Sequence, residues 1–136
     1  MTRENSAAET ILLVDDNPTN LQLLFDTLDG RGYKLLIAKD GKAALSIAGK
    51  ARPNLILLDI MMPQIDGYEV CRRLKADPTT AEIPVIFLSA LTDTKDKVQG
   101  LDLGAVDYVT KPFQPDEVIA RVNTHLTVYR LKKALD

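Results

Sequence analysis

Short apolar segments alternate with longer amphipathic segments along most of this chain. Each short segment is almost continuously hydrophobic, which is typical of parallel strands that are covered on both faces. The pattern predicts strands at Thr10–Asp15, Tyr33–Ala38, Asn54–Asp59, Pro84–Leu88 and Val106–Val109. We therefore expect a parallel sheet built from these five segments.

The longer segments carry apolar residues three and four positions apart, as on one face of a helix. The first of them places such residues at Leu21, Leu24, Phe25 and Leu28. Asn17 and Pro18 precede this stripe, and an asparagine cap followed by a first-turn proline marks a helix start. Alternating strands and helices predict an α/β domain, a doubly wound sheet in a three-layer sandwich.

Polar side chains stand where several of the predicted strands end. Right-handed crossovers make the strands parallel, so their C-terminal ends share one edge of the sheet, where open α/β sheets bind ligands. The residues at that edge are Asp15 and Asp16 after the first strand, Asp59 after the third, Ser89 after the fourth and Lys111 after the fifth. We expect their side chains to lie close together.

The bulk composition restricts the function classes. A chain of 136 residues is expected to fold as one domain. Its 17 basic and 19 acidic residues give no broad basic surface, so nucleic-acid binding by this segment is not expected. Cys71 is the only cysteine, which fits a reducing compartment, and no apolar run approaches the roughly 20 residues of a membrane span. We expect a cytoplasmic protein with a flexible tail at residues 1–9, which lack a signal peptide's apolar stretch.

The acids and the lysine together predict a phosphoryl-transfer site. Magnesium prefers oxygen ligands, and Asp15, Asp16 and Asp59 can supply them. Without a cation, the clustered carboxylates would repel one another and raise at least one pKa. Asp59 could attack phosphorus and become an aspartyl phosphate, with Lys111 and Ser89 placed on the phosphoryl oxygens.

Several motifs, in one order and spacing, give the chain a family resemblance over most of its length. They are Asp15-Asp16, Asp59 with Met62-Pro63 and Asp66-Gly67, Ser89-Ala90, Gly104-Ala105-Val106-Asp107-Tyr108 and Lys111-Pro112-Phe113. From about Thr10 to about Leu126, the chain resembles a response-regulator receiver domain of two-component signalling. The resemblance implies a flavodoxin-like fold with strand order 2-1-3-4-5 and five helices, and a phosphorylation-controlled switch rather than an enzyme.

The resemblance also implies how the acidic residues would act. Asp59 would accept a phosphoryl group from a phosphohistidine on a sensor histidine kinase or a histidine phosphotransfer protein. Asp16 and Asp59 would ligate magnesium directly, and Asp15 mainly through water. The backbone carbonyl of Met61 would be another magnesium ligand.

Other residues would respond to the phosphoryl group if the resemblance holds. Ser89 and Lys111 would hold it, and Tyr108 would be a switch residue that turns inward when Ser89 moves toward the phosphate. The peptide bond between Lys111 and Pro112 would be cis. The family often dimerises through its last helix–strand–helix face, here about Asp93 to Leu126.

Other function classes make different demands on the same positions. A phosphatase of the haloacid-dehalogenase type expects an acid two residues after the nucleophile, where this chain has Met61. A nucleotide- or flavin-binding module expects a glycine-rich loop after the first strand, where this chain has Asp15-Asp16-Asn17-Pro18. A docking module that takes no phosphate would not need the complete set of acids, serine and lysine. His125, the only histidine, lies outside that set, and we predict a surface or packing role for it.

Two positions depart from a pattern that would favour rapid phosphate loss. The second residues after the phosphoacceptor and after Ser89 tune dephosphorylation in the family, and here they are Met61 and Leu91. Neither apolar side chain can orient an attacking water. We therefore expect a long-lived aspartyl phosphate.

The last helix is expected to extend beyond the receiver-like segment, residues 10–126. It could run from Pro115 to Leu135, and its end carries an apolar stripe of Val128, Leu131 and Leu135. We expect residues 127–136 to be a helical extension that begins a linker into an output or kinase module.

Overall fold

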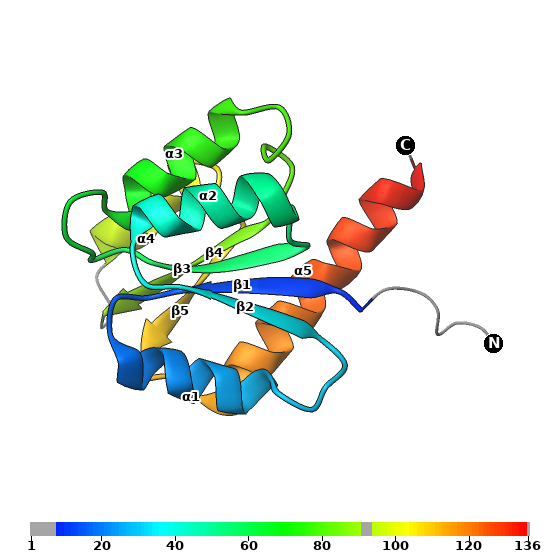
Figure 1. Ribbon diagram of the computed structural model, residues 1–136, viewed down its shortest axis with the longest axis horizontal. Helices are drawn as coiled ribbons and strands as arrows, with labels where there is room; N and C mark the ends of the chain where they lie inside the picture. The colour runs from blue at the N-terminus through cyan, green and yellow to red at the C-terminus, as the bar shows by residue number, and fades with distance from the viewer. Residues whose placement is uncertain (1–7, 91–93, 136) are drawn as a thin grey trace.

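The structure is a computed structural model that describes residues 8–90 and 94–135. Five parallel strands form one sheet in the order β2-β1-β3-β4-β5 (Figure 1). They are β1 (Thr10–Val14), β2 (Lys34–Ala38), β3 (Leu55–Asp59), β4 (Val85–Ala90) and β5 (Asp107–Lys111). The helices are α1 (Pro18–Leu28), α2 (Gly41–Ala51), α3 (Gly67–Ala76), α4 (Thr94–Asp102) and α5 (Pro115–Leu135). Within the described ranges, no helix has both the length and the apolar character needed to cross a bilayer.

Helices cover both faces of the sheet, so the predicted three-layer sandwich is confirmed. Figure 1 shows α1 and α5 on one face, with α2, α3 and α4 on the other. Successive strand residues point to opposite faces and therefore enter different cores. Leu12 and Ile56 belong to the core beneath α2 and α3, whereas Ile11 and Leu57 belong to the core beneath α1 and α5. These cores make β1 and β3 rigid supports for the residues at their ends.

Each predicted strand boundary lies within two residues of the observed one, but β4 and β5 are longer than predicted. Ser89 pairs with Thr110 and Ala90 with Lys111, so the parallel ladder continues beyond the apolar runs. The predicted strands ended at the last apolar residue, whereas backbone hydrogen bonding between strands can continue through residues with polar side chains. Ser89 consequently lies inside β4, and Lys111 is the last residue of β5.

Helix α5 has the predicted bounds and continues past the body of the domain. Its buried positions end at Leu126. Beyond that point Val128, Leu131 and Leu135 are exposed, so the apolar stripe of the extension has no cover within the described residues. An ion pair of 2.9 Å between Arg130 and Glu9 connects the extension to the segment that leads into β1.

Candidate functional site

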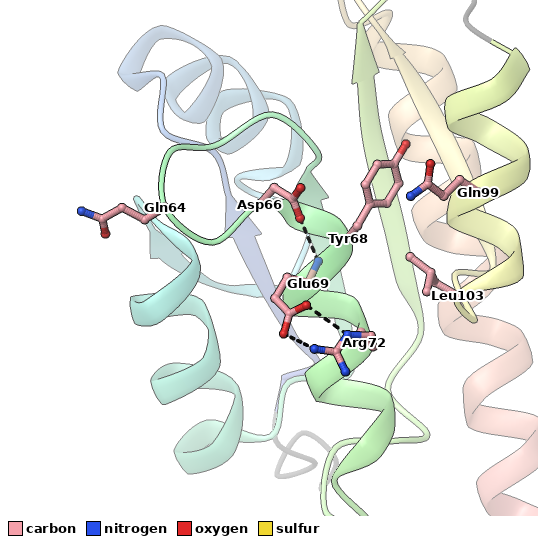
Figure 2. A pocket seen from close by; sticks show the side chains of 7 residues that line it. All are labelled: Gln64, Asp66, Tyr68, Glu69, Arg72, Gln99 and Leu103. Carbon is pink, nitrogen blue, oxygen red and sulfur yellow. Dashed lines mark hydrogen bonds and ion pairs between the residues drawn. The ribbon is translucent and has the colours of Figure 1, made fainter.

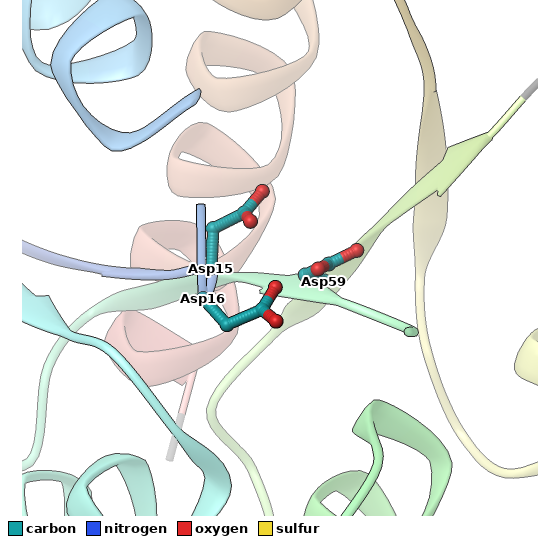
Figure 3. A group of neighbouring side chains, drawn as sticks. All are labelled: Asp15, Asp16 and Asp59. Carbon is teal, nitrogen blue, oxygen red and sulfur yellow. The ribbon is translucent and has the colours of Figure 1, made fainter. Parts of the chain in front are cut away.

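Three carboxylates meet at the C-terminal edge of the sheet, as the strand arrangement predicts. Asp59 ends β3, while Asp15 and Asp16 directly follow β1, which is the neighbour of β3 in the sheet. One carboxylate oxygen from each residue lies within 4.8 Å of those from the other two (Figure 3). Asp15 and Asp59 are buried, whereas Asp16 is exposed and leaves the cluster accessible to solvent.

Lys111 brings a positive charge to the two buried acids. Its Nζ lies 2.9 Å from Asp59 Oδ1 and 3.3 Å from Asp15 Oδ2. Backbone groups also contact these acids: Asn17 N–H donates to Asp15 Oδ1 at 2.9 Å, and Met61 N–H makes a long contact of 3.4 Å with Asp59 Oδ1. The lysine therefore acts as counter-ion to both buried acids.

One lysine does not fully compensate the buried negative charge. Burial, with a further contribution from the charge of Asp15, raises the pKa of Asp59 to about 6, although the hydrogen bond from Lys111 opposes this. Burial alone would lower the pKa of Lys111, but its hydrogen bond and charge interaction with Asp59 raise it overall. The site therefore favours an additional cation next to Asp59.

The donor set fits a hard divalent cation such as magnesium. All three side chains offer oxygen atoms, which such ions prefer. Asp15 Oδ2 is fully buried and accepts no hydrogen bond from the described residues, although Lys111 is near. A buried carboxylate oxygen without a hydrogen bond is costly even beside an ammonium group, and a bound metal cation would compensate the charge that Lys111 leaves. Asp15, Asp16 and Asp59 could thus hold the ion.

The loop between β3 and α3 packs closely against the backbone of Asp59. Gly67 N–H donates to the carbonyl of Ile60 at 2.8 Å, and Asp66 caps α3 by accepting from Glu69 N–H at 2.9 Å. A Cβ atom on Gly67 would lie 2.2 Å from the carbonyl oxygen of Asp59, a separation that side chains do not reach. Sequence reasoning placed Gly67 in a motif but did not predict this contact.

The predicted switch residues lie on β4, the neighbour of the strand that ends at Asp59, and on β5, the next strand in the sheet. Ser89 is buried one residue beyond Leu88, the partner of Asp59 in the sheet, and its hydroxyl makes a long contact of 3.5 Å with the carbonyl of Ala90. Tyr108 is half-buried, with the guanidinium carbon of Arg121 at 5.8 Å from its ring centre. The switch roles of both residues remain predictions.

Three further expectations have different outcomes. The cis peptide bond between Lys111 and Pro112 is confirmed. His125 lies away from the acidic cluster, with Nε2 at 2.9 Å from Asp107 Oδ2, which fits the predicted surface or packing role. Leu91 lies outside the described residues.

A separate hollow of about 460 Å³ lies between α3 and α4 (Figure 2). Its acids already have partners. Asp66 caps α3, and Glu69 accepts hydrogen bonds from Arg72 and Arg73. The acidic cluster, rather than this hollow, offers charged groups for a ligand.

Comparison with known proteins agrees with this geometry. The family model for the response regulator receiver domain matches residues 11–123. The chain belongs to this family. The receiver domain is a phosphorylation-controlled signalling switch, and the phosphatase and docking alternatives are not favoured.

The relatives of this receiver domain are longer proteins. It is 46% identical over 116 residues to the DNA-binding dual master transcriptional regulator RpaA of Synechocystis sp., covering 85% of this chain and 48% of RpaA. It is also 46% identical over 121 residues to the response regulator PleD of Caulobacter vibrioides, covering 89% of this chain and 26% of PleD. The chain thus spans half or less of these relatives.

A solved structure supports the same family at the level of the fold. The receiver domain of a Francisella response regulator is 36% identical and superposes with a TM-score of 0.80, covering 88% of this chain and 97% of that one. The five parallel strands in the order 2-1-3-4-5 and the five helices are those predicted from the resemblance.

Proposed function

We propose that Asp59 is the phosphoacceptor of this receiver domain. The observation that carries the proposal is the position of its carboxylate: buried at a strand end, paired with Lys111 at 2.9 Å and clustered with two more acids. One Asp59 oxygen would attack the phosphorus of a phosphohistidine. A bond from oxygen to phosphorus forms, the bond from phosphorus to nitrogen breaks, and the imidazole leaves with the electron pair.

We assign the other site residues to charge stabilisation and ligand binding. Asp15, Asp16, Asp59 and the backbone carbonyl of Met61 would hold magnesium, which when bound would neutralise charge on the phosphoryl oxygens. Lys111, already 2.9 Å from an Asp59 oxygen, would keep contact with the phosphoryl group that forms there.

The hydroxyl of Ser89 would donate to a phosphoryl oxygen, and Tyr108 would turn inward as Ser89 moves. Both residues lie on strands beside the site: on β4, Ser89 follows the partner of Asp59, and on β5, Tyr108 pairs with Phe87 of β4. Their positions support the proposal that phosphorylation of Asp59 changes the conformation of Ser89 and then of Tyr108 on β5.

We propose that the partner of this domain is a sensor histidine kinase or a histidine phosphotransfer protein in the cytoplasm. The relatives are response regulators, which supports this class of partner. Residues 127–136 would begin a linker to an output or kinase module, and the face from about Asp93 to Leu126 would support a homodimer. The exposed apolar stripe of the extension supports the linker.

A labelling experiment tests the proposed function. With magnesium and acetyl phosphate, the protein is expected to gain the mass of one phosphoryl group. Excess EDTA should prevent the gain, because three neighbouring acids would repel the phosphate without a cation. Intact-protein mass spectrometry measures both results. Absence of labelling with magnesium, or equal labelling in EDTA, would contradict the proposal.

The phosphoryl group is expected to persist after labelling. Met61 is the second residue after Asp59, and its apolar side chain cannot orient an attacking water. The measurement is the fraction of phosphorylated protein over time after removal of acetyl phosphate. A half-life of seconds would refute the expectation of a long lifetime.

A further inference from the structure

The described part of the chain contains two adjacent methionines in opposite environments. Met61 is 72% exposed, whereas Met62 is 8% exposed and packs in the core. Exposed thioethers are oxidised to sulfoxides far more readily than buried ones. Cys71 is buried, and burial raises the pKa of its thiol, so it remains in the less reactive protonated form.

Met61 also stands directly beside the proposed phosphoacceptor. Its backbone N–H points toward Asp59 Oδ1 at 3.4 Å. The chain is held in place on both sides of it, because Ile60 and Met62 are buried and the Ile60 carbonyl accepts from Gly67 N–H at 2.8 Å. The backbone of Met61 is thus held at the rim of the site, with its side chain exposed to solvent.

We propose that Met61 is an oxidation site and that its oxidation shortens the lifetime of the phosphoryl group on Asp59. In the first step, a peroxide transfers one oxygen atom to sulfur. The sulfur loses two electrons and becomes a sulfoxide, and hydrogen peroxide is reduced to water. The second part of the proposal rests on the proposed function of Asp59.

Oxidation to the sulfoxide would change the chemistry of an exposed side chain two residues after the proposed phosphoacceptor. A thioether is a weak hydrogen-bond acceptor, whereas a sulfoxide oxygen is polar and can hold a water molecule. Attack of that water on phosphorus forms inorganic phosphate and returns the electron pair to the Asp59 carboxylate. One net hydrogen bond to the attacking water corresponds to about threefold to tenfold faster phosphate loss.

The experiment uses dilute hydrogen peroxide on the wild-type protein and on Met61→Leu. Peptide mass spectrometry quantifies oxidation at each methionine, and Met61 should be oxidised well before Met62. Both proteins are then phosphorylated with acetyl phosphate and magnesium, and phosphate loss is compared with that of the same protein before peroxide. The rate should rise only in the wild type, and methionine sulfoxide reductases should reverse the rise.

Each outcome bears on a different part of the proposal. Equal oxidation of Met61 and Met62 would overturn the oxidation site. Selective oxidation with an unchanged rate, or the same rise in Met61→Leu, would overturn the effect on lifetime. A protein that takes up no phosphoryl group even before peroxide would overturn the proposed function and the lifetime effect with it, while the peptide result would still decide the oxidation site.

Discussion

Replacing Asp59 with asparagine is expected to abolish phosphoryl uptake from acetyl phosphate. An amide oxygen is a poor nucleophile, and the change also removes one charge from the cluster that would hold magnesium. Intact-protein mass spectrometry should show no gain in the variant. Asp102→Asn is the control, since this exposed residue at the end of α4 lies outside the site. Labelling that persists in Asp59→Asn would place the phosphoacceptor elsewhere.

The same variant should be more stable than the wild type at neutral pH when metal is removed. Burial raises the pKa of Asp59 to about 6, above its usual value of 3.8, so the fold disfavours the ionised form. The stability associated with protonated Asp59 is fully present below pH 3.8 and is lost as the pH rises through about 6. Asparagine does not titrate and avoids this loss.

Relative to the wild type, the Asp59→Asn variant is expected to gain roughly 1–3 kcal/mol in unfolding free energy near pH 8. The gain is reduced because Lys111 loses its carboxylate partner. Near pH 4 the two proteins should be almost equally stable. Urea unfolding in EDTA at both pH values measures the difference, with Asp102→Asn again as control. A variant that is less stable than the wild type near pH 8 would show that the Lys111 pair outweighs the cost of burying the charge.

Replacing Gly67 with alanine is expected to destabilise the domain and impair labelling together. The added Cβ would lie 2.2 Å from the Asp59 carbonyl oxygen and 2.8 Å from Ile60 Cα, and both are backbone atoms that cannot rotate away. The loop and the start of α3 must shift, at a cost of about 1–3 kcal/mol or more. That shift would displace Asp59 itself, so urea unfolding and acetyl phosphate labelling should both change.

Gly49→Ala provides the matched control for Gly67→Ala. Gly49 lies inside α2, and a Cβ there would have no atom within 4 Å. Alanine is the better helix former, so stability should stay the same or rise by about 0.5–1 kcal/mol. Labelling should be unaffected. If both variants lose stability alike, the close approach of Gly67 to Asp59 is not the cause.

The acidic cluster could be predicted from sequence because it depends on topology. Near-continuous apolar strands imply a parallel sheet, and a parallel sheet brings its C-terminal ends to one edge. That reasoning placed Asp15, Asp16, Asp59 and Lys111 together without any knowledge of side-chain packing, and the structure does bring them together.

Features that depend on distances of a few ångströms could not be predicted in this way. Nothing in the pattern shows that Lys111 contacts Asp15 as well as Asp59, or that Gly67 approaches the Asp59 carbonyl. The ends of β4 and β5 were missed because backbone pairing, not hydrophobicity, determines where a ladder stops. Likewise, the spacing of Met61 and Met62 does not reveal which of the two is exposed.

Beyond Leu126, helix α5 projects from the body of the domain as a lever arm, with Arg130 paired to Glu9 along it. From Leu126, the last buried position, to Leu135 the helix rises about 14 Å at 1.5 Å per residue. A tilt of about 10° at Leu126 would therefore displace the tip by about 2 Å. The root of this arm includes Arg121, which pairs with Asp107 at 2.8 Å and lies over the ring of Tyr108. A small repacking of that tyrosine would thus produce a larger displacement at the tip of the arm.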